Sequence, residues 1–188
     1  RARMKELVPN LTGKMKGMSA FGTPGVVIPC ESLGDMPVRN WGQGKYTEGA
    51  QKLSGQVMKE KYLKKQFFCA SCPVGCGRVV GGTIDPALEE TGGPEYETLA
   101  MLGSNLLVDD MQAVMRLNEL TNRLGMDTIE TGSVVGFCME LYEKGLIGPK
   151  ELGELDLKWG NAQAAEGLIR MIAKREGFGD VLAEGLKV

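Results

Sequence analysis

The chain has 188 residues, of which 43% are hydrophobic and 24% are charged, with a formal net charge of −2 and a pI near 5.4. This length and composition are ordinary for a globular domain with its own hydrophobic core. The slightly acidic balance argues against nucleic acid as a partner, and no apolar run is long enough to span a membrane. An odd cysteine count without a secretory signal predicts a reducing, cytoplasmic location.

In chain order, residues 1 to 45 are rich in Gly and Pro, and turn signals at 22–25 and 36–41 predict an irregular segment with one short helix. Thr47 is a candidate N-cap for a helix over about 47 to 64, because the apolar residues behind it recur at helical spacing despite Gly55. Residues 81 to 93 are predicted to be a surface excursion.

The second half of the chain predicts a series of capped helices. Apolar residues are spaced for helices over about 96–106, then from Asp109 or Asp110 to Gly125, and from Thr128 to Gly145. A short extended stretch and turn at 155–161 precedes a helix from 164 to 177 and a last short helix near 180. Strands are scarce, so the predicted fold class is all-α, a multihelical domain with an irregular Gly/Pro-rich N-terminal segment.

Three of the five cysteines, Cys69, Cys72 and Cys76, form a C-x2-C-x3-C run. Three thiolates so close in sequence favour a metal, and the absence of histidine and of a second C-x2-C pair disfavours zinc. An iron–sulfur cluster is therefore the preferred interpretation. The spacing disfavours radical enzymes that use S-adenosylmethionine, whose run has the opposite order. The remaining alternative is an oxidisable or disulfide-bonded trio.

A cubane cluster normally takes four thiolates, so the fourth ligand is either Cys30, Cys138 or a residue outside this chain. Glycines on both sides of Cys76 predict a tight loop whose N–H groups can face cluster sulfurs. Arg78 follows directly and places a fixed positive charge beside the predicted site.

Two carboxylates and a phenol, those of Glu95, Glu97 and Tyr96, stand at the expected start of a helix. The positive end of the helix dipole favours ionised acids there, so a first-turn charge is the simplest interpretation. The alternative is that the two carboxylates and the phenol carry chemistry.

A second polar constellation occupies residues 122–128. Gly125 is a candidate left-handed C-cap and Asp127 a candidate N-cap, which together explain a corner between two helices without a ligand. The second interpretation is a binding site, because the side chains of Asn122 and Asp127 have the groups needed to bind the donor and acceptor edge of a heterocycle. The spacing alone does not choose between these interpretations.

Several motifs in one order resemble the tungsten-containing aldehyde:ferredoxin oxidoreductase family, and the likeness covers almost the whole chain. They are PVRNW at 37–41, the cysteine run with GR at 69–78, PEYET at 94–98, GSNL at 103–106, LGMDTI at 124–129 and the tail at 173–185. In that family, tungsten held by two pterins oxidises aldehydes to carboxylic acids, and a nearby [4Fe–4S] cluster passes the electrons to ferredoxin.

The resemblance implies that Cys69, Cys72 and Cys76 are ligands of the [4Fe–4S] cluster. It places Glu97 in the tungsten pocket as a group that moves a proton, and Tyr96 in the wall of the same pocket.

The resemblance also assigns Asn122, Gly125, Met126 and Asp127 to one of the family's two pterin-binding corners, normally D-x-x-G-L-D. Asn122 replaces the first aspartate and still accepts a hydrogen bond without bringing charge. Met126 replaces leucine at similar volume. With Arg78 beside the cysteines, these residues form the expected cofactor-binding set.

The family's enzymes are longer, with an N-terminal β-rich cofactor domain and a C-terminal helical domain that supplies the second pterin corner, the fourth cysteine and a catalytic histidine. Residues 1–188 are expected to correspond to the middle helical domain, whose partners are those two domains, ferredoxin or another electron acceptor, and an aldehyde. The isolated chain is expected to hold no tungsten or molybdenum pterin and to be inactive. The alternatives are a non-catalytic interaction domain and an iron–sulfur electron-transfer module derived from the same family.

Overall fold

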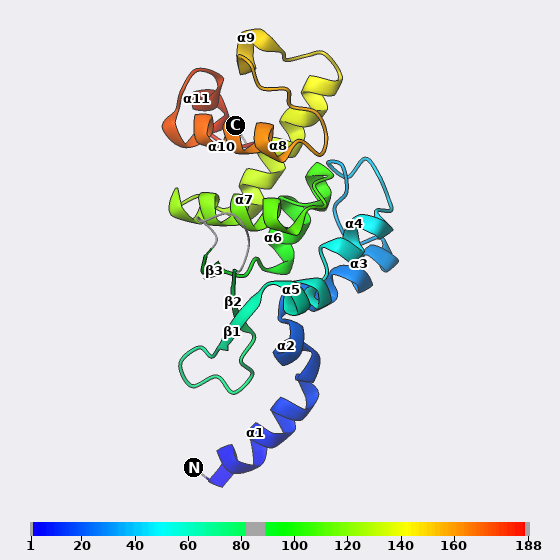
Figure 1. Ribbon diagram of the computed structural model, residues 1–188, viewed down its shortest axis with the longest axis vertical. Helices are drawn as coiled ribbons and strands as arrows, with labels where there is room; N and C mark the ends of the chain where they lie inside the picture. Colours follow the sequence, from blue (N-terminus) through cyan, green and yellow to red (C-terminus); the bar gives the residue numbers. More distant parts are fainter. Residues whose placement is uncertain (1, 82–88, 187–188) are drawn as a thin grey trace.

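The computed structural model describes residues 2–81 and 89–186. Helices follow one another along the long axis of the molecule, with α1 (Ala2–Lys14) extending at one end and the last helices at the other (Figure 1). A small sheet lies at the side of this series. The predicted all-α class is confirmed, because helices dominate the fold, and the small sheet is an addition to it.

The prediction of an irregular N-terminal segment is wrong for its first two thirds. After α1 come α2 (Lys16–Phe21), the 3-10 helix η1 (Thr23–Val26) and α3 (Val27–Leu33). The glycines mark the breaks between helices: Gly22 has φ 65° and Gly34 has φ 76°, a left-handed region that favours glycine. Among the described residues before α4, the stretch from Gly34 to Tyr46 has little regular structure.

The single helix predicted over 47 to 64 is also wrong, because the chain forms α4 (Thr47–Lys52) and α5 (Gly55–Lys61) instead. Ser54 starts the second helix by accepting a hydrogen bond from the Val57 N–H at 3.3 Å. Thr47 is the first residue of α4 and not its cap. Its hydroxyl donates to the buried carboxylate of Glu31 at 2.8 Å.

The sheet has three antiparallel strands in the order β1 (Leu63–Phe67), β2 (Gly77–Val80) and β3 (Thr91–Gly92). Phe67 is paired with Gly77 at the end of the β1–β2 ladder where the intervening loop joins the two strands. The cysteine run is therefore the connection of a hairpin. Of the excursion predicted at 81 to 93, residues 82–88 lie outside the described residues, and its end forms β3.

The caps predicted in the second half are confirmed. After α6 (Tyr96–Met101) and the 3-10 helix η3 (Ser104–Leu106), α7 (Met111–Arg123) begins at Asp110, which accepts from the Gln112 N–H at 2.9 Å. The next helix, α8 (Thr128–Glu143), begins at Asp127 and is followed by Gly145 with φ 67°.

The C-terminal part contains α9 (Pro149–Leu152), α10 (Ala162–Lys174) and α11 (Phe178–Leu182). The predicted turn is confirmed at 159–160, and residues 155–158 before it form neither helix nor strand. Because the Asn161 side chain accepts from the Ala164 N–H at 3.1 Å, α10 begins two residues earlier than predicted.

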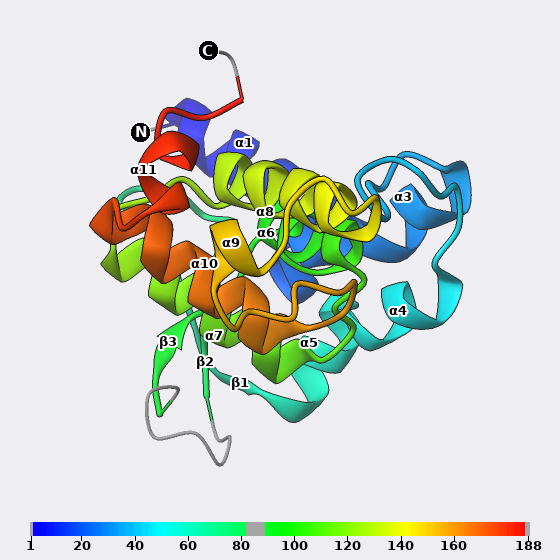
Figure 2. The same ribbon diagram turned by 90° about the horizontal axis from the view of Figure 1, so that it is seen from above.

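The hydrophobic core lies mainly among α6, α7, α8 and α10, which pack side by side and are seen together from above in Figure 2. Core residues from these helices include Leu99, Val114, Met115, Leu117, Val135, Met139, Leu168 and Ile169. A Cβ added at Gly132 would lie 2.6 Å from the Met101 carbonyl oxygen, so glycine lets α8 approach α6 this closely.

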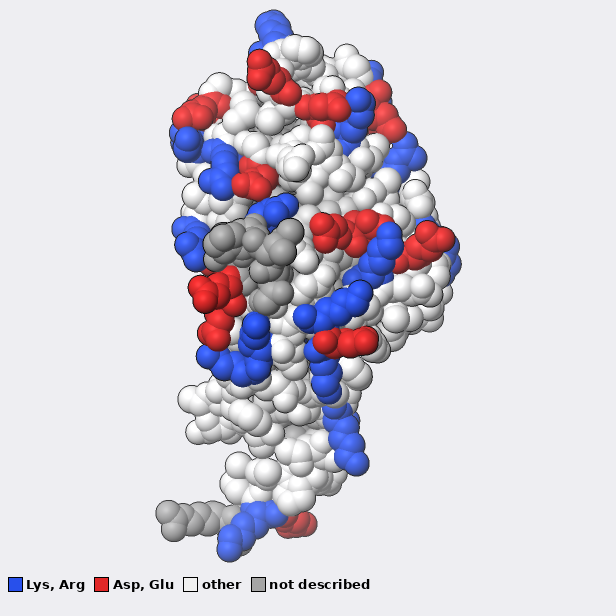
Figure 3. Space-filling view, viewed as in Figure 1, with Lys and Arg blue, Asp and Glu red and all other residues white. Residues whose placement is uncertain are grey.

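The surface carries charges of both signs. On the face drawn in Figure 3, lysine and arginine side chains are interspersed with aspartate and glutamate over the body of the molecule. Within the part of the chain that the structure describes, no helix combines the length and apolar character needed to cross a bilayer.

Candidate functional site

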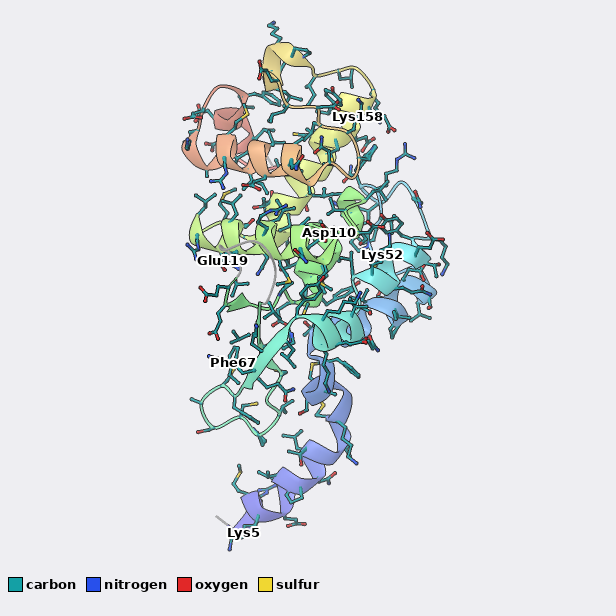
Figure 4. All side chains as sticks on the ribbon, in the orientation of Figure 1. Lys5, Lys52, Phe67, Asp110, Glu119 and Lys158 are labelled. Carbon is teal, nitrogen blue, oxygen red and sulfur yellow. The ribbon has the colours of Figure 1, made fainter. Side chains whose placement is uncertain are left out.

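The cysteine loop, residues 69–76, joins β1 to β2. Cys69 is exposed, Cys72 and Cys76 are half-buried, and none is in a disulfide. The Cys72 N–H donates to the Cys69 carbonyl at 3.0 Å, and Gly75 has φ 66°, so the loop turns tightly at both ends. The rings of Phe68 and Phe67 lie so close to Gly75 and Gly77 that a Cβ at either glycine would overlap them. Phe67 is labelled where β1 enters the loop (Figure 4).

The thiols of the loop do not converge on a point. Across residues 2–81 and 89–186, no three cysteine, aspartate or glutamate side chains are gathered closely enough to hold a metal ion. The donor set nevertheless suits an iron–sulfur cluster in its chemistry, because three free thiols occupy one short, largely accessible loop.

The other two cysteines lie in helices and not in this loop. Cys138 is in the core on α8, where burial raises the pKa of its thiol to about 12. Cys30 is on α3, beside the phenol of Tyr96. The structure therefore gives neither of them the role of a fourth ligand.

Arg78 links the cysteine loop to the start of α6. Its side chain is buried, and it donates to the Cys76 carbonyl at 2.5 Å and to the Pro94 carbonyl at 3.3 Å. The guanidinium also forms an ion pair with Glu95 at 2.8 Å. Its Nε atom is buried without a hydrogen-bond partner. The arginine that sequence analysis placed beside the cysteines thus holds the third of them against the helix that carries Glu97.

Glu95 belongs to the same network, a role that sequence analysis missed. Its second carboxylate oxygen accepts a hydrogen bond from the Thr23 hydroxyl, whose oxygen accepts from the Tyr96 N–H at 2.9 Å. An acidic residue at a helix entrance usually serves the dipole, so no local signal revealed this partner 72 residues away.

Glu97 and Asn122 line one surface cavity of about 460 Å³, between the start of α6, the end of α7 and the start of α8. The lining residues are Gly92, Gly93, Glu95, Glu97, Thr98, Asn118, Asn122, Thr128 and Ile129.

Hydrogen bonds hold the walls of this cavity together. The Asn118 amide donates to the Gly92 carbonyl at 3.1 Å, and the Thr98 and Thr128 hydroxyls are 2.9 Å apart. The cavity therefore brings a proposed proton-transfer carboxylate and a proposed pterin-binding amide to one place.

Tyr96 points away from this cavity. It is half-buried, its hydroxyl donates to the Asp35 carbonyl at 3.3 Å, and it is not among the lining residues. Burial raises the pKa of the Tyr96 phenol above its usual value, and the adjacent Cys30 raises it further. Consecutive residues of a helix do not face the same way, which explains why Tyr96 and Glu97 separate.

The corner at residues 122–127 has the predicted helix–turn–helix form. Gly125 has φ 69°, and the Met126 N–H donates back to the Thr121 carbonyl at 3.0 Å. The Asp127 carboxylate accepts from the Glu130 N–H at 2.8 Å, and Met126 packs against the core. Asn122 faces the cavity, while its amide donates to Asn118 at 3.1 Å.

Comparison with known proteins places this arrangement in a family. The profile described as aldehyde ferredoxin oxidoreductase, domains 2 and 3, matches residues 1–188. A tungsten-containing aldehyde ferredoxin oxidoreductase of Pyrococcus furiosus is 44% identical over 170 residues, which cover 90% of this chain and 27% of that protein. The tungsten-containing aldehyde ferredoxin oxidoreductase of Thermococcus kodakarensis is 40% identical over the same length, again covering 90% of this chain and 27% of the relative.

One more distant relative shares part of the sequence, and one solved structure shares the fold. The aliphatic sulfonate oxidoreductase WOR-like subunit of Pyrococcus furiosus is 30% identical over 196 residues, covering 98% of this chain and 30% of that subunit. The active-site complex BamBC of benzoyl coenzyme A reductase has a similar fold, with a TM-score of 0.64 at 20% identity over 80% of this chain and 22% of that chain.

The chain thus spans between about a quarter and a third of the length of these relatives. The profile covers every residue, and the relatives from Pyrococcus and Thermococcus match nine tenths of the chain at 40% identity or more. This chain belongs to the aldehyde ferredoxin oxidoreductase family.

Proposed function

We propose that this chain is part of a tungsten–pterin, iron–sulfur oxidoreductase that oxidises aldehydes to carboxylic acids. The observation that carries the proposal is the shared cavity of Glu97 and Asn122, joined to the cysteine loop through Arg78 and Glu95. Family membership supports the same reaction class.

Each predicted site residue has a role in this proposal. Cys69, Cys72 and Cys76 would hold a [4Fe–4S] cluster. Asn122 and Asp127, at the two ends of the corner, would accept hydrogen bonds from pterin N–H groups, and the backbone around Gly125 and Met126 would allow the ring to approach. The bound tungsten–pterin would supply the two-electron oxidation chemistry and the cluster one-electron transfer.

Glu97 would act on protons. Its carboxylate is exposed to the cavity and makes no hydrogen bond to any described residue, so it is available to accept a proton from an aldehyde hydrate or a water molecule. Tyr96 would support this turn from behind, since its phenol packs toward α3.

The complete protein is proposed to be longer than this chain, because the chain spans 27% of the length of its most similar relatives reported above. Residues 1–188 would form the middle helical domain, flanked by an N-terminal cofactor domain and a C-terminal helical domain. Ferredoxin or another carrier would accept electrons, in a reducing cytoplasm where the exposed thiol of Cys69 stays free. Tungsten is the metal in the names of the two relatives at 40% identity or more, with molybdenum as the alternative.

The test is the iron and tungsten content of the complete protein, prepared without air. Wild-type protein is expected to contain both metals and to reduce a dye when an aldehyde is added. Cys72→Ala should lose most of the iron, because it removes one of the four thiolates that a cubane cluster normally takes, three of them from this loop. Cys138→Ala, which truncates a buried thiol in α8, is the matched control and should keep it.

Two outcomes would contradict the proposal. Equal iron content in Cys72→Ala and Cys138→Ala would show that the loop does not hold the cluster. A full complement of iron with no tungsten or molybdenum would support an electron-transfer module in place of the enzyme.

A further inference from the structure

The Arg78 side chain is 4% exposed, which is unusual for a residue that is always charged. A buried charge is costly unless it is paired and hydrogen-bonded. Here the guanidinium reaches two backbone carbonyls, those of Cys76 and Pro94, and the carboxylate of Glu95. These partners come from two sides: the end of the cysteine loop and the residues directly before α6.

A slot for this guanidinium is built by the N-terminal helices. Gly22 lies between α2 and η1 with φ 65°, and a Cβ there would overlap the Arg78 Nη1 atom. The next residue, Thr23, donates to Glu95 and accepts from the Tyr96 N–H. Three segments distant in sequence therefore meet at one arginine.

We propose that Arg78 is a positioning residue that holds the cysteine loop in register with the Tyr96–Glu97 turn and sets the charge beside the group that the loop binds. This inference rests on the proposed function, since it assumes a redox cluster on the loop. The planar fork of arginine donates to several acceptors at once, which the single ammonium of lysine does not reproduce. A fixed positive charge also favours the reduced, more negative form of a neighbouring cluster.

Two properties can therefore be separated by substitution in the complete protein. Arg78→Gln removes the charge and should move the midpoint potential of the cluster to more negative values. Arg78→Lys keeps the charge but not the fork, so the potential should stay near that of wild type. The aldehyde-driven reduction of the cluster should slow by about tenfold to a hundredfold in Arg78→Lys, because misplacement of a reacting group by about 1 Å costs this much.

Gly22→Ala tests the slot without changing any charge. It should displace the guanidinium and slow aldehyde-driven reduction as Arg78→Lys does. Gly34→Ala is its matched control, because Gly34 also has a positive φ, 76°, but an added Cβ there would meet nothing within 4 Å. Arg170→Gln is the control for charge, since Arg170 pairs with Glu166 at 2.7 Å on the surface of α10.

The readouts are the midpoint potential from a redox titration followed by electron paramagnetic resonance, and the rate of cluster reduction by aldehyde. If Arg78→Gln does not fold, Arg78→Lys and Gly22→Ala carry the test through the rate. A wild-type potential in folded Arg78→Gln, together with wild-type rates in Arg78→Lys and Gly22→Ala, would overturn this inference and leave the proposed function standing. A wild-type protein without a cluster would overturn the proposed function and the inference with it.

Discussion

Glu95 and Glu97 are two residues apart, yet their surroundings give them different chemistry. The Glu95 carboxylate is held by Arg78 and Thr23, whereas Glu97 faces the cavity without a hydrogen bond to a described residue. Their positions at the start of α6 did not distinguish them, because the helix dipole favours an acidic residue at either position. The difference arises from the distant partner of Glu95.

This difference leads to a prediction for Glu97→Gln in the complete enzyme. The amide keeps the shape of the side chain and removes the basic site, so turnover should fall by about a hundredfold or more while metal content stays near normal. Steady-state aldehyde oxidation and tungsten analysis are the measurements.

The control for that substitution is Glu48→Gln, because Glu48 is a first-turn carboxylate of α4 and does not line the cavity. Glu95→Gln is unsuitable, since it would leave the buried Arg78 without its ion pair. Equal turnover in Glu97→Gln and Glu48→Gln would show that Glu97 is only a helix-entry charge.

At the scale of elements, local signals were predictable and pairing between segments was not. Asp110, Gly125, Asp127 and Gly145 mark helix ends through contacts within a few residues, and all four predictions hold. The single helix predicted over 47 to 64 is wrong because the chain breaks at Ser54, which caps α5. The apolar spacing continues across this break, so it did not reveal the boundary.

The hairpin around the cysteine loop was missed for a related reason. The β1 strand is mostly exposed, so its sequence lacks the alternation that marks a half-buried strand. Its pairing with β2 depends on the intervening loop and on the Phe67–Gly77 position, which a search for periodicity does not detect.

The two aspartate caps allow the structural and cofactor roles of the corner to be separated. Asp110→Ala and Asp127→Ala each remove an N-cap from a helix of 13 or 16 residues and should each lower the free energy of unfolding by about 1 kcal/mol. Only Asp127→Ala should also reduce the tungsten and pterin content of the complete protein. Thermal or denaturant unfolding and metal analysis measure the two effects, and equal tungsten in both variants would leave Asp127 with a purely structural role.

At the scale of the whole molecule, the candidate site is a product of tertiary packing. Residues 92–98 and 118–129 meet because α6, α7 and α8 pack together, and Gly132 permits that approach. Motif resemblance assigned Glu97, Asn122 and the three cysteines to the candidate site, because motifs carry the residue types, and these roles stay proposals. It did not reveal that Tyr96 turns away, or that Gly22 and Thr23 complete the Arg78 network, since these depend on the path of the N-terminal helices.

The most direct test of the account is whether reduction of the cluster on the cysteine loop by aldehyde depends on the Glu97 carboxylate. Complete wild-type protein and Glu97→Gln are mixed with aldehyde without air, and the reduced cluster is followed by electron paramagnetic resonance. Wild-type protein should develop the signal, and Glu97→Gln should develop it about a hundredfold more slowly while dithionite still reduces its cluster fully. If aldehyde reduces the cluster of Glu97→Gln at the same rate as the cluster of the wild-type protein, the account is contradicted.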